Sequence, residues 1–465
     1  MSLFSALSTS LSGLQAVTSQ LQLVANNIAN AGQAGYTRKN ATTSPISLGG
    51  VGGGTQITGF TRAENTALTK TLYATTANAG LRNAQDDYSQ QVQTLLGANS
   101  GENPPLSDAI SQFSSAWTEL AAAPESQVQQ QQVIQAAKNL VAQVSSVAGG
   151  VEELDRQVYS DINTTVSELN SNLINIKDLN AKISQATSSN QPPGDLQDQR
   201  DQLVLKVASL IDIKVLPRDQ GQIALYTPTG YALLDGEEQS FSYDGTKISA
   251  DSAPTQSLND VLVNGKLQAL VNFRRDDSPS SVSTDSGTEV IRKLRSQLDT
   301  IVSAFTTSSA GPPETFAYAY ANATGTGTEA TSIFSGTTRN DFVVNSTLLN
   351  GSRTVKVSSP QSVTATFNDS SKSFSADGLT LTNASYNTLA TSIVSGFQQS
   401  ASTISQLATT AEGQRSFLEQ RLASETGVNT DTELVNLTTL QNSYAASARV
   451  MAVIQEMFRN LEAIT

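Results

Sequence analysis

The chain has 465 residues, a formal net charge of −13, and neither cysteine nor histidine. Nucleic acids and anionic membranes attract basic surfaces, so this acidic balance argues against both as partners. Imidazole catalysis, thiolate nucleophiles, disulfides and most zinc sites are excluded by the missing residue types, and we expect no cofactor. The length predicts two to four domains.

The first thirty residues form an uncharged heptad pattern. No Asp, Glu, Lys or Arg occurs before Arg38. Ser, Gln and Thr interrupt the apolar residues, so we expect neither a secretory signal nor membrane insertion. The pattern predicts a helix with a seam for a partner helix, because apolar residues recur every seven positions at Leu7, Leu14, Leu21 and Ile28.

The last thirty residues repeat this pattern, and residues 434–448 again contain no Asp, Glu, Lys or Arg. The seam positions are Leu437, Tyr444, Met451, Ile454, Phe458 and Leu461. We expect the two chain ends to pack against each other. Such seams can also be the inside of a bundle within one chain, but uncharged outer faces favour contacts with further copies, so we interpret both sets as an assembly interface.

Between the ends, the predicted elements follow one another as long helices interrupted by β-rich stretches. Residues 37–61 are expected to form an extended Gly-rich connector rather than a packed element. A helix that starts near Pro124, with apolar spacing over 140–183, predicts a helical rod roughly 90 Å long. Further helices are predicted at about 62–96, 107–122, 195–210, 264–275, 285–307 and from 386 onward, and β structure at 211–262 and 310–385.

These elements predict an α+β, mainly α fold. Because the ends look like partners, the long helices must run out and back, which places the small mid-sequence β domain at the distal end of an elongated rod. The predicted domains are a terminal-helix domain (1–36 plus 428–465), the connector (37–61), a long-helix domain (62–309 plus 386–427, with the β-rich segment 211–262) and a distal β domain (310–385).

No stretch of the sequence predicts a catalytic, nucleotide-binding or metal site. The Gly cluster 49–54 matches neither a dinucleotide fingerprint nor a P-loop. Asp276, Asp277 and Asp285 do not have the spacing of a calcium loop, and Trp117 lies at helical spacing typical of a core residue. We therefore expect no catalytic residue and no metal site.

The stretch 12–41, SGLQAVTSQLQLVANNIANAGQAGYTRKNA, resembles the N-terminal signature of bacterial flagellar axial proteins, the rod, hook and hook-associated group. Three short motifs follow one another in the order of that signature, a Ser-Gly-Leu, an Ala-Asn-Asn-Ile-Ala-Asn and a Gly-Tyr. They assign as motif residues Ser12, Gly13, Leu14, Asn26, Asn27, Ile28, Asn30, Gly35 and Tyr36.

Four further stretches are similar to the hook-associated protein 1 family, the first junction between hook and filament; they are 195–215, 264–277, 332–345 and 427–458. The resemblance implies a structural protein without enzymatic activity, exported through the flagellar type III apparatus to an extracellular junction. Its implied partners are itself in a ring, the hook protein, the second junction protein and an export chaperone at the C-terminal helix.

Two alternatives stay open at this point. One is the second junction protein or another axial protein of the hook or rod, although a hook protein would be rich in β structure just after residue 70, where this chain is predicted to be helical. The other is a secreted adhesin or enzyme on an axial scaffold. It would need a polar constellation in 310–385, where mainly Ser, Thr, Asn and Gly occur.

Overall fold

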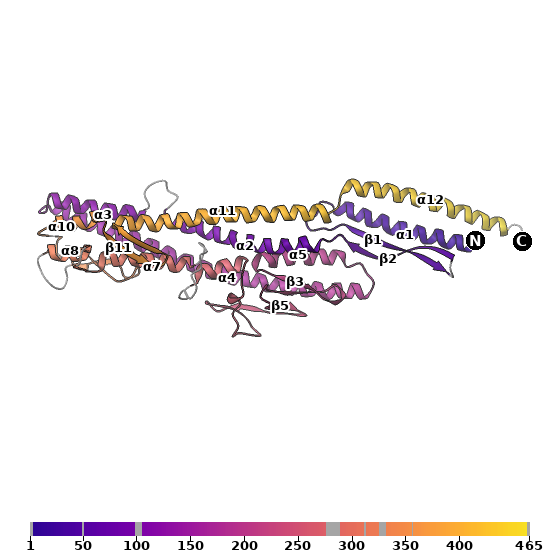
Figure 1. The fold of residues 1–465 in the computed structure, drawn as a ribbon, viewed down its shortest axis with the longest axis horizontal. Coiled ribbons are helices and arrows are strands. Elements are labelled where there is room, and N and C mark those ends of the chain that lie inside the picture. Colours follow the sequence, from indigo (N-terminus) through magenta and orange to yellow (C-terminus); the bar gives the residue numbers. More distant parts are fainter. Residues whose placement is uncertain are drawn as a thin grey trace.

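The computed structural model describes residues 3–48, 51–97, 105–275, 289–310, 313–324, 332–355 and 357–462. Its elements form an elongated molecule with both chain ends at one tip (Figure 1). The helices are α1 (Leu3–Asn30), α2 (Thr66–Leu95), α3 (Pro105–Ala122), α4 (Gln127–Ser188), α5 (Gly194–Leu210), α6 (Lys266–Arg274), α7 (Val290–Thr306), α8 (Phe316–Ala323), α9 (Ser346–Leu349), α10 (Pro360–Asn368), α11 (Tyr386–Thr426) and α12 (Thr430–Glu462).

The strands form small antiparallel sheets. Four of these sheets are two-stranded and one has four strands in the order β3-β4-β5-β6. The strands are β1 (Lys39–Leu48), β2 (Val51–Arg62), β3 (Lys214–Pro217), β4 (Ile223–Tyr226), β5 (Ala232–Asp235), β6 (Glu237–Glu238), β7 (Phe241–Tyr243), β8 (Ile248–Ala250), β9 (Phe334–Ser335), β10 (Val343–Val344), β11 (Lys372–Ala376) and β12 (Leu379–Ala384). The predicted fold class, mainly α with small sheets, is confirmed.

The long helix α4 is the axis of the rod. Its 62 residues run without a break past Gly149 and Gly150, and at 1.5 Å per residue they span about 93 Å. Apolar residues three and four positions apart keep one stripe of α4 buried along its whole length. α3, α5, α6 and α7 pack on α4, while α11 lies alongside α2. One continuous apolar core runs from Tyr73 to Val394.

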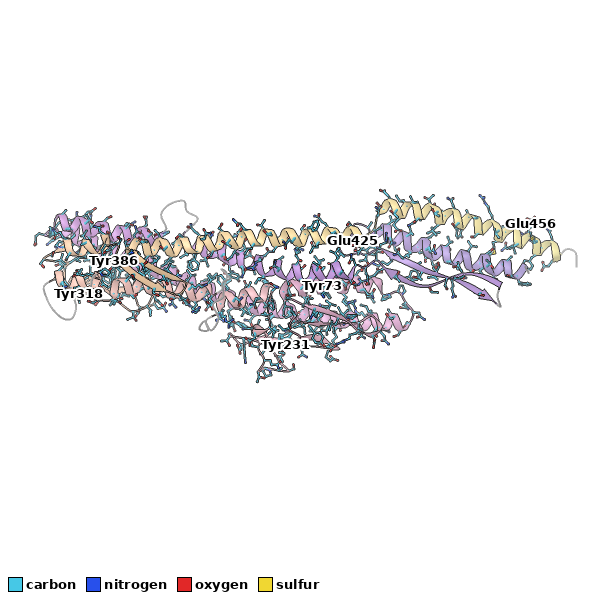
Figure 2. All side chains as sticks on the ribbon, in the orientation of Figure 1. Tyr73, Tyr231, Tyr318, Tyr386, Glu425 and Glu456 are labelled. Carbon is cyan, nitrogen blue, oxygen red and sulfur yellow. The ribbon has the colours of Figure 1, made fainter. Side chains whose placement is uncertain are left out.

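The end of the rod opposite the chain termini is held by aromatic packing. Tyr318 and Tyr386 lie there, whereas Glu456 lies at the tip with the chain ends (Figure 2). The fully buried Phe113 of α3 is at the centre of this cluster. Its ring centroid lies 5.3 to 6.3 Å from the rings of Trp117, Phe305, Phe316, Phe334 and Phe367. The core role predicted for Trp117 is thereby confirmed.

Three predictions of local structure are wrong. Residues 37–61, predicted as an extended connector rather than a packed element, contain most of the β1–β2 hairpin, and β2 packs on α1. Residues 316–323, within the predicted β domain 310–385, form the helix α8. Residues 363–367 (VTATF), predicted as a strand, lie in α10, because Pro360 starts a helix and its Val363 and Phe367 are buried one turn apart. In the described part of 353–359 no strand forms, while 379–384 is a strand as predicted. The Asp276, Asp277 and Asp285 group lies outside the described residues.

Replacing Phe113 with Ala tests the aromatic cluster. We expect Phe113→Ala to lower the free energy of unfolding by about 3–5 kcal/mol, because it empties a fully buried site. Phe417→Ala is the matched control, since Phe417 also lies on a helix but is 62% exposed; it should change stability by less than about 0.5 kcal/mol. Denaturant unfolding of the full chain measures both, and equal losses would contradict this account.

Candidate functional site

The two chain ends meet as predicted and form, with the hairpin, one compact group. We call α1, β1, β2 and α12 the terminal unit. α1 packs on α12 on one side and on β2 on the other. The two helices run antiparallel, because the ring of Phe4 near the start of α1 lies 5.2 Å from the ring of Phe458 near the end of α12. Figure 1 shows the layers α12, α1 and hairpin in that order.

The predicted seam residues lie in this unit but are incompletely covered. Ile454 is buried, and Tyr444 is 44% exposed. Leu7, Leu14, Leu21, Ile28, Leu437, Met451 and Phe458 are half-buried, and the side chain of Leu461 lies outside the described part. By contrast, α4 buries apolar residues at every turn. α1 and α12 therefore share a coiled-coil seam, but its residues are less buried than those of a complete hydrophobic core.

α12 is apolar on a second face as well. Val435, Val450, Val453 and Met457, which we call the outer stripe, are 66%, 51%, 50% and 50% exposed. By the 3.6-residue period they lie about 140° around α12 from Leu437, Met451 and Phe458. A helix that is apolar on two faces needs a partner on each, and α1 covers one of them.

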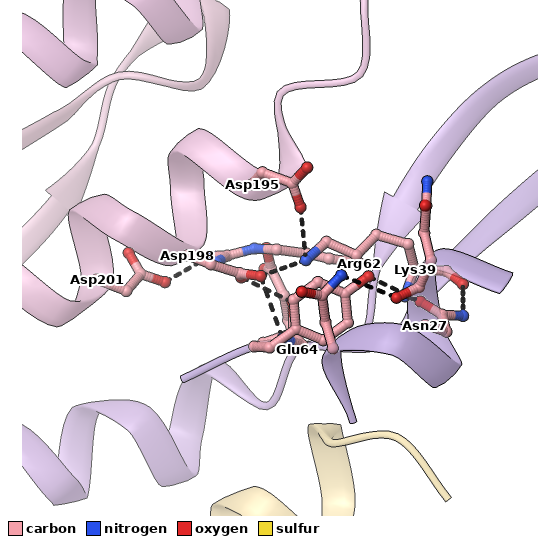
Figure 3. A network of polar contacts seen from close by, with 11 residues as sticks. Asn27, Lys39, Arg62, Glu64, Asp195, Asp198 and Asp201 are labelled. Atoms are coloured by element: carbon pink, nitrogen blue, oxygen red, sulfur yellow. Dashed lines mark hydrogen bonds and ion pairs between the residues drawn. The ribbon is translucent and has the colours of Figure 1, made fainter. Parts of the chain in front are cut away.

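The motif residues build the connection between the terminal unit and the rod (Figure 3). Asn27 is buried, and its Nδ2 donates to the Lys39 carbonyl at 3.0 Å. Its Oδ1 accepts from the Lys39 backbone N–H and from the Tyr36 hydroxyl, both at 3.1 Å. Lys39 Nζ lies 3.5 Å from the centroid of the Tyr36 ring. Asn27 and Tyr36 thus place the Lys39 ammonium.

The Lys39 ammonium meets acidic side chains of α5. Lys39 Nζ pairs with Asp198 and, at 3.1 Å, with Asp195. Arg62 pairs with the same Asp198 at 3.1 Å and with Asp201 at 2.7 Å. Asp198 also accepts from the Thr37 backbone N–H and hydroxyl. We call this cluster the joint; it consists of Asn27, Tyr36, Lys39, Arg62, Asp195, Asp198 and Asp201.

Burial dominates the electrostatics of the joint. Burial, with the nearby Asp195, Asp198 and Glu433 carboxylates, raises the pKa of Tyr36 to about 12. Burial also raises the pKa of the Asp201 carboxyl, and the Arg62 and Arg200 guanidinium groups only partly offset this. Burial disfavours the charged form of Arg62, but the Asp201 and Glu64 carboxylates outweigh this effect and raise the pKa of Arg62. The joint holds its charges only while its members are together.

Other motif residues set close backbone approaches. Gly35 has a φ of +78°, and a Cβ there would lie 1.7 Å from Gln202 Nε2 on α5. Ser12 Oγ accepts from the Thr55 N–H at 3.3 Å, where Gly54 brings the hairpin against α1. Asn30 donates to the Asn26 carbonyl at 2.9 Å and closes the last turn of α1. A Cβ at Gly13 would meet no atom within 4 Å, so packing does not explain that glycine.

The sequence prediction found one half of the joint and missed the other. Asn27 and Tyr36 were assigned through the motif, whereas Lys39, Arg62 and Asp198 were not. A signal for them exists: Arg38, Lys39 and Arg62 are the sole charged residues in 1–63, and Asp195, Asp198 and Asp201 recur every third residue on one face of α5. The basic residues at the foot of the hairpin and the acidic face of α5 together predict that the two segments are in contact.

Comparison with known proteins agrees with this architecture. Residues 89–309 match the family model of the flagellar hook-associated protein FlgK helical domain, and residues 419–464 match that of the flagellar basal body rod FlgEFG protein C-terminal. Over both segments the chain is thus similar to flagellar axial proteins.

Among these proteins the predicted resemblance is confirmed, since the chain is similar to flagellar hook-associated protein 1. It is 29% identical to that protein from Salmonella typhimurium over 293 residues, 59% of this chain and 52% of the relative. The corresponding values are 26% over 254 residues for Bacillus subtilis, covering 51% of this chain and 50% of the relative. The matched segment thus spans about half the length of the curated relatives.

A solved structure aligns with part of the chain. The flagellar hook junction protein FlgK from Burkholderia pseudomallei aligns with 57% of this chain and 46% of its own, at 20% identity and a TM-score of 0.46.

Among the described helices of this chain, none combines the length and the apolar character that a bilayer crossing requires.

Removing one charge from the joint tests its role. We expect Asp198→Asn to weaken the attachment of the terminal unit by about 3–5 kcal/mol, because Lys39 and Arg62 lose a shared partner whose side chain is 9% exposed. Asp195→Asn is the matched control on the same ammonium; its side chain is 79% exposed, so the loss should stay below about 1 kcal/mol.

Amide exchange across 39–62 and denaturant unfolding measure the two variants. Equal protection of the hairpin in both variants would show that the joint does not hold the terminal unit on α5.

Proposed function

We propose that this chain is a structural subunit of the bacterial flagellum at the junction between hook and filament, and that it assembles through its terminal helices. One observation carries the proposal: α12 is apolar on two faces, and its outer stripe is covered by no other described part of the chain. Exposed apolar stripes of this kind mark protein contacts. The match of 89–309 to a hook-associated helical domain supports the junction over a hook or rod position.

The seam residues support self-assembly in the same way. Leu14, Leu21 and Met451 remain half-buried in the single chain, so neighbouring copies can complete the burial that one pair of helices leaves undone. Residues 1–37 carry no Asp, Glu, Lys or Arg, and covering them desolvates no charge. A ring of copies would therefore assemble at an extracellular junction through these same terminal helices.

The further partners we propose are the hook protein and the second junction protein on either side of the ring, and an export chaperone at α12 before secretion. An unassembled outer stripe invites aggregation, and a chaperone groove is a suitable cover for an amphipathic helix. The role we propose is structural, and the charged side chains of Lys39 and Arg62 in the hairpin are engaged in the joint.

Replacing Leu21 with Asp tests assembly through the seam. We expect Leu21→Asp to abolish attachment of filaments, because burying an unpaired carboxylate costs several kcal/mol in every subunit of the ring (about 3 or more). The rod should keep its thermal unfolding, since its core lies outside α1. The neighbouring Gln22→Asp is the control, because Gln22 is exposed.

The measurement is complementation of cells that lack this protein, scored by filaments attached to hooks. Normal filaments with Leu21→Asp, or an equal defect with Gln22→Asp, would show that the seam is not an assembly surface.

A further inference from the structure

The outer face of α11 lacks the charges that surface helices normally carry. Residues 386–411 include no Asp, Glu, Lys or Arg. Solvated helix faces are usually rich in Glu, Lys and Arg. The exposed face of α4 follows that rule between residues 152 and 188, with Glu153, Arg156, Glu168, Asp178 and Lys182, whereas residues 127–151 contain Lys138 alone. The contrast with α11 therefore concerns this second part of α4.

The side chains on this face are small or neutral, with large apolar residues among them. We define the outer face of α11 by its exposed residues Ser395, Gln399, Thr403, Gln406, Leu407, Thr410, Gly413 and Phe417. Leu407 is 42% exposed and Phe417 62%. The opposite side of α11 is already used, because Leu389, Ile393 and Ile404 are buried where the helix packs along α2.

Two glycines on exposed positions of α11 add a separate observation. A Cβ at Gly396 or Gly413 would meet no atom within 4 Å. A glycine inside a helix is costly relative to alanine, and nothing within this chain requires one there. In the rod, Gly149 of α4 is open in the same way, whereas at Gly80 a Cβ would lie 2.1 Å from the Ser209 carbonyl oxygen of α5. The open glycines suit a close approach from outside the chain.

We propose that the outer face of α11 is a lateral contact with a second copy of this chain in the assembled flagellum. This inference rests on the proposed function. Copies that each carry a net charge of −13 repel one another, so their contact is most favourable where neither side presents charge. The face also continues the assembly surface, because α11 leads directly into α12 along one edge of the molecule (Figure 1).

The size of this face explains why it acts together with α12. Residues 386–411 span about 39 Å of helix about 10 Å wide, or roughly 400 Å² on each copy. A stable interface needs about 800 Å² on each partner. The α11 face alone is too small to hold a dimer in dilute solution, whereas α11 and one face along all 33 residues of α12 together offer about 900 Å². The contact therefore forms only in the assembly.

A charge placed on this face tests the contact. Thr410 is exposed, and its hydroxyl donates to the Gln406 carbonyl at 2.8 Å. Thr164 on α4 is its matched control, exposed and bonded in the same way to the Ser160 carbonyl at 3.1 Å. We expect Thr410→Asp to reduce incorporation into sheared, isolated flagella by about tenfold or more, and Thr164→Asp by less than about twofold. Gln399→Asp repeats the test at a second exposed position of the same face of α11.

Cross-linking identifies the occupant. Because the sequence contains no cysteine, Thr410→Cys carries a single thiol that a benzophenone maleimide can label. Illumination of assembled flagella should give a covalent dimer of this chain, and the labelled Thr164→Cys should not. Three outcomes would overturn the inference and leave the proposed function intact. These are a cross-link to a different protein, no cross-link although the chain is present in flagella, or equal cross-linking from both positions. Absence of the wild-type chain from flagella would overturn the proposed function and the inference with it.

Discussion

The placement of charge is the constraint on which the terminal unit depends. The three charged residues within 1–63 lie at the base of the hairpin, and two of them, Lys39 and Arg62, are fixed by Asp198 of α5. All the remaining surface of α1, β1 and β2 is neutral. One buried cluster therefore attaches the unit to the rod, and the rest of α1, β1 and β2 presents no charge that would be costly to desolvate against another protein.

Rod and terminal unit consequently differ in how they are stabilised. The rod is finished within one chain, since α4 buries a continuous stripe and an aromatic cluster closes its far end around Phe113. The terminal unit is unfinished, because most of its seam residues are half-buried and its outer stripe is exposed. Covering by neighbours would supply the missing apolar burial, and the ordering entropy of the ends would be offset at that step.

The sequence was sufficient for the parts of the fold that depend on local periodicity. Long amphipathic helices such as α4, and the pairing of the two heptad ends, follow from spacing alone. Residues 363–367 show where periodicity is ambiguous: Val363 and Phe367 fit a strand face and a helix face equally, and packing of α10 on α3 and α8 decides for the helix. The hairpin was missed because its glycines predict flexibility, while its stability comes from α1.

The joint could be predicted only in part, because its members come from segments about 160 residues apart. The motif pointed to Asn27 and Tyr36, but their partner Lys39 and the acidic face of α5 become a site only when the chain brings them together. The assembly role of the seam and the domain boundaries within the rod stay predictions.

Amide hydrogen exchange tests the central claim, that the terminal pair is completed by neighbouring copies. Exchange would be measured at Leu14 of α1, Met451 of α12 and Val144 of α4, in dilute monomer and in isolated flagella. The account predicts weak protection at Leu14 and Met451 in the monomer, strong protection at Val144 in both states, and a large gain at the two terminal positions on assembly. Protection at Leu14 and Met451 in the dilute monomer equal to that at Val144 would contradict it.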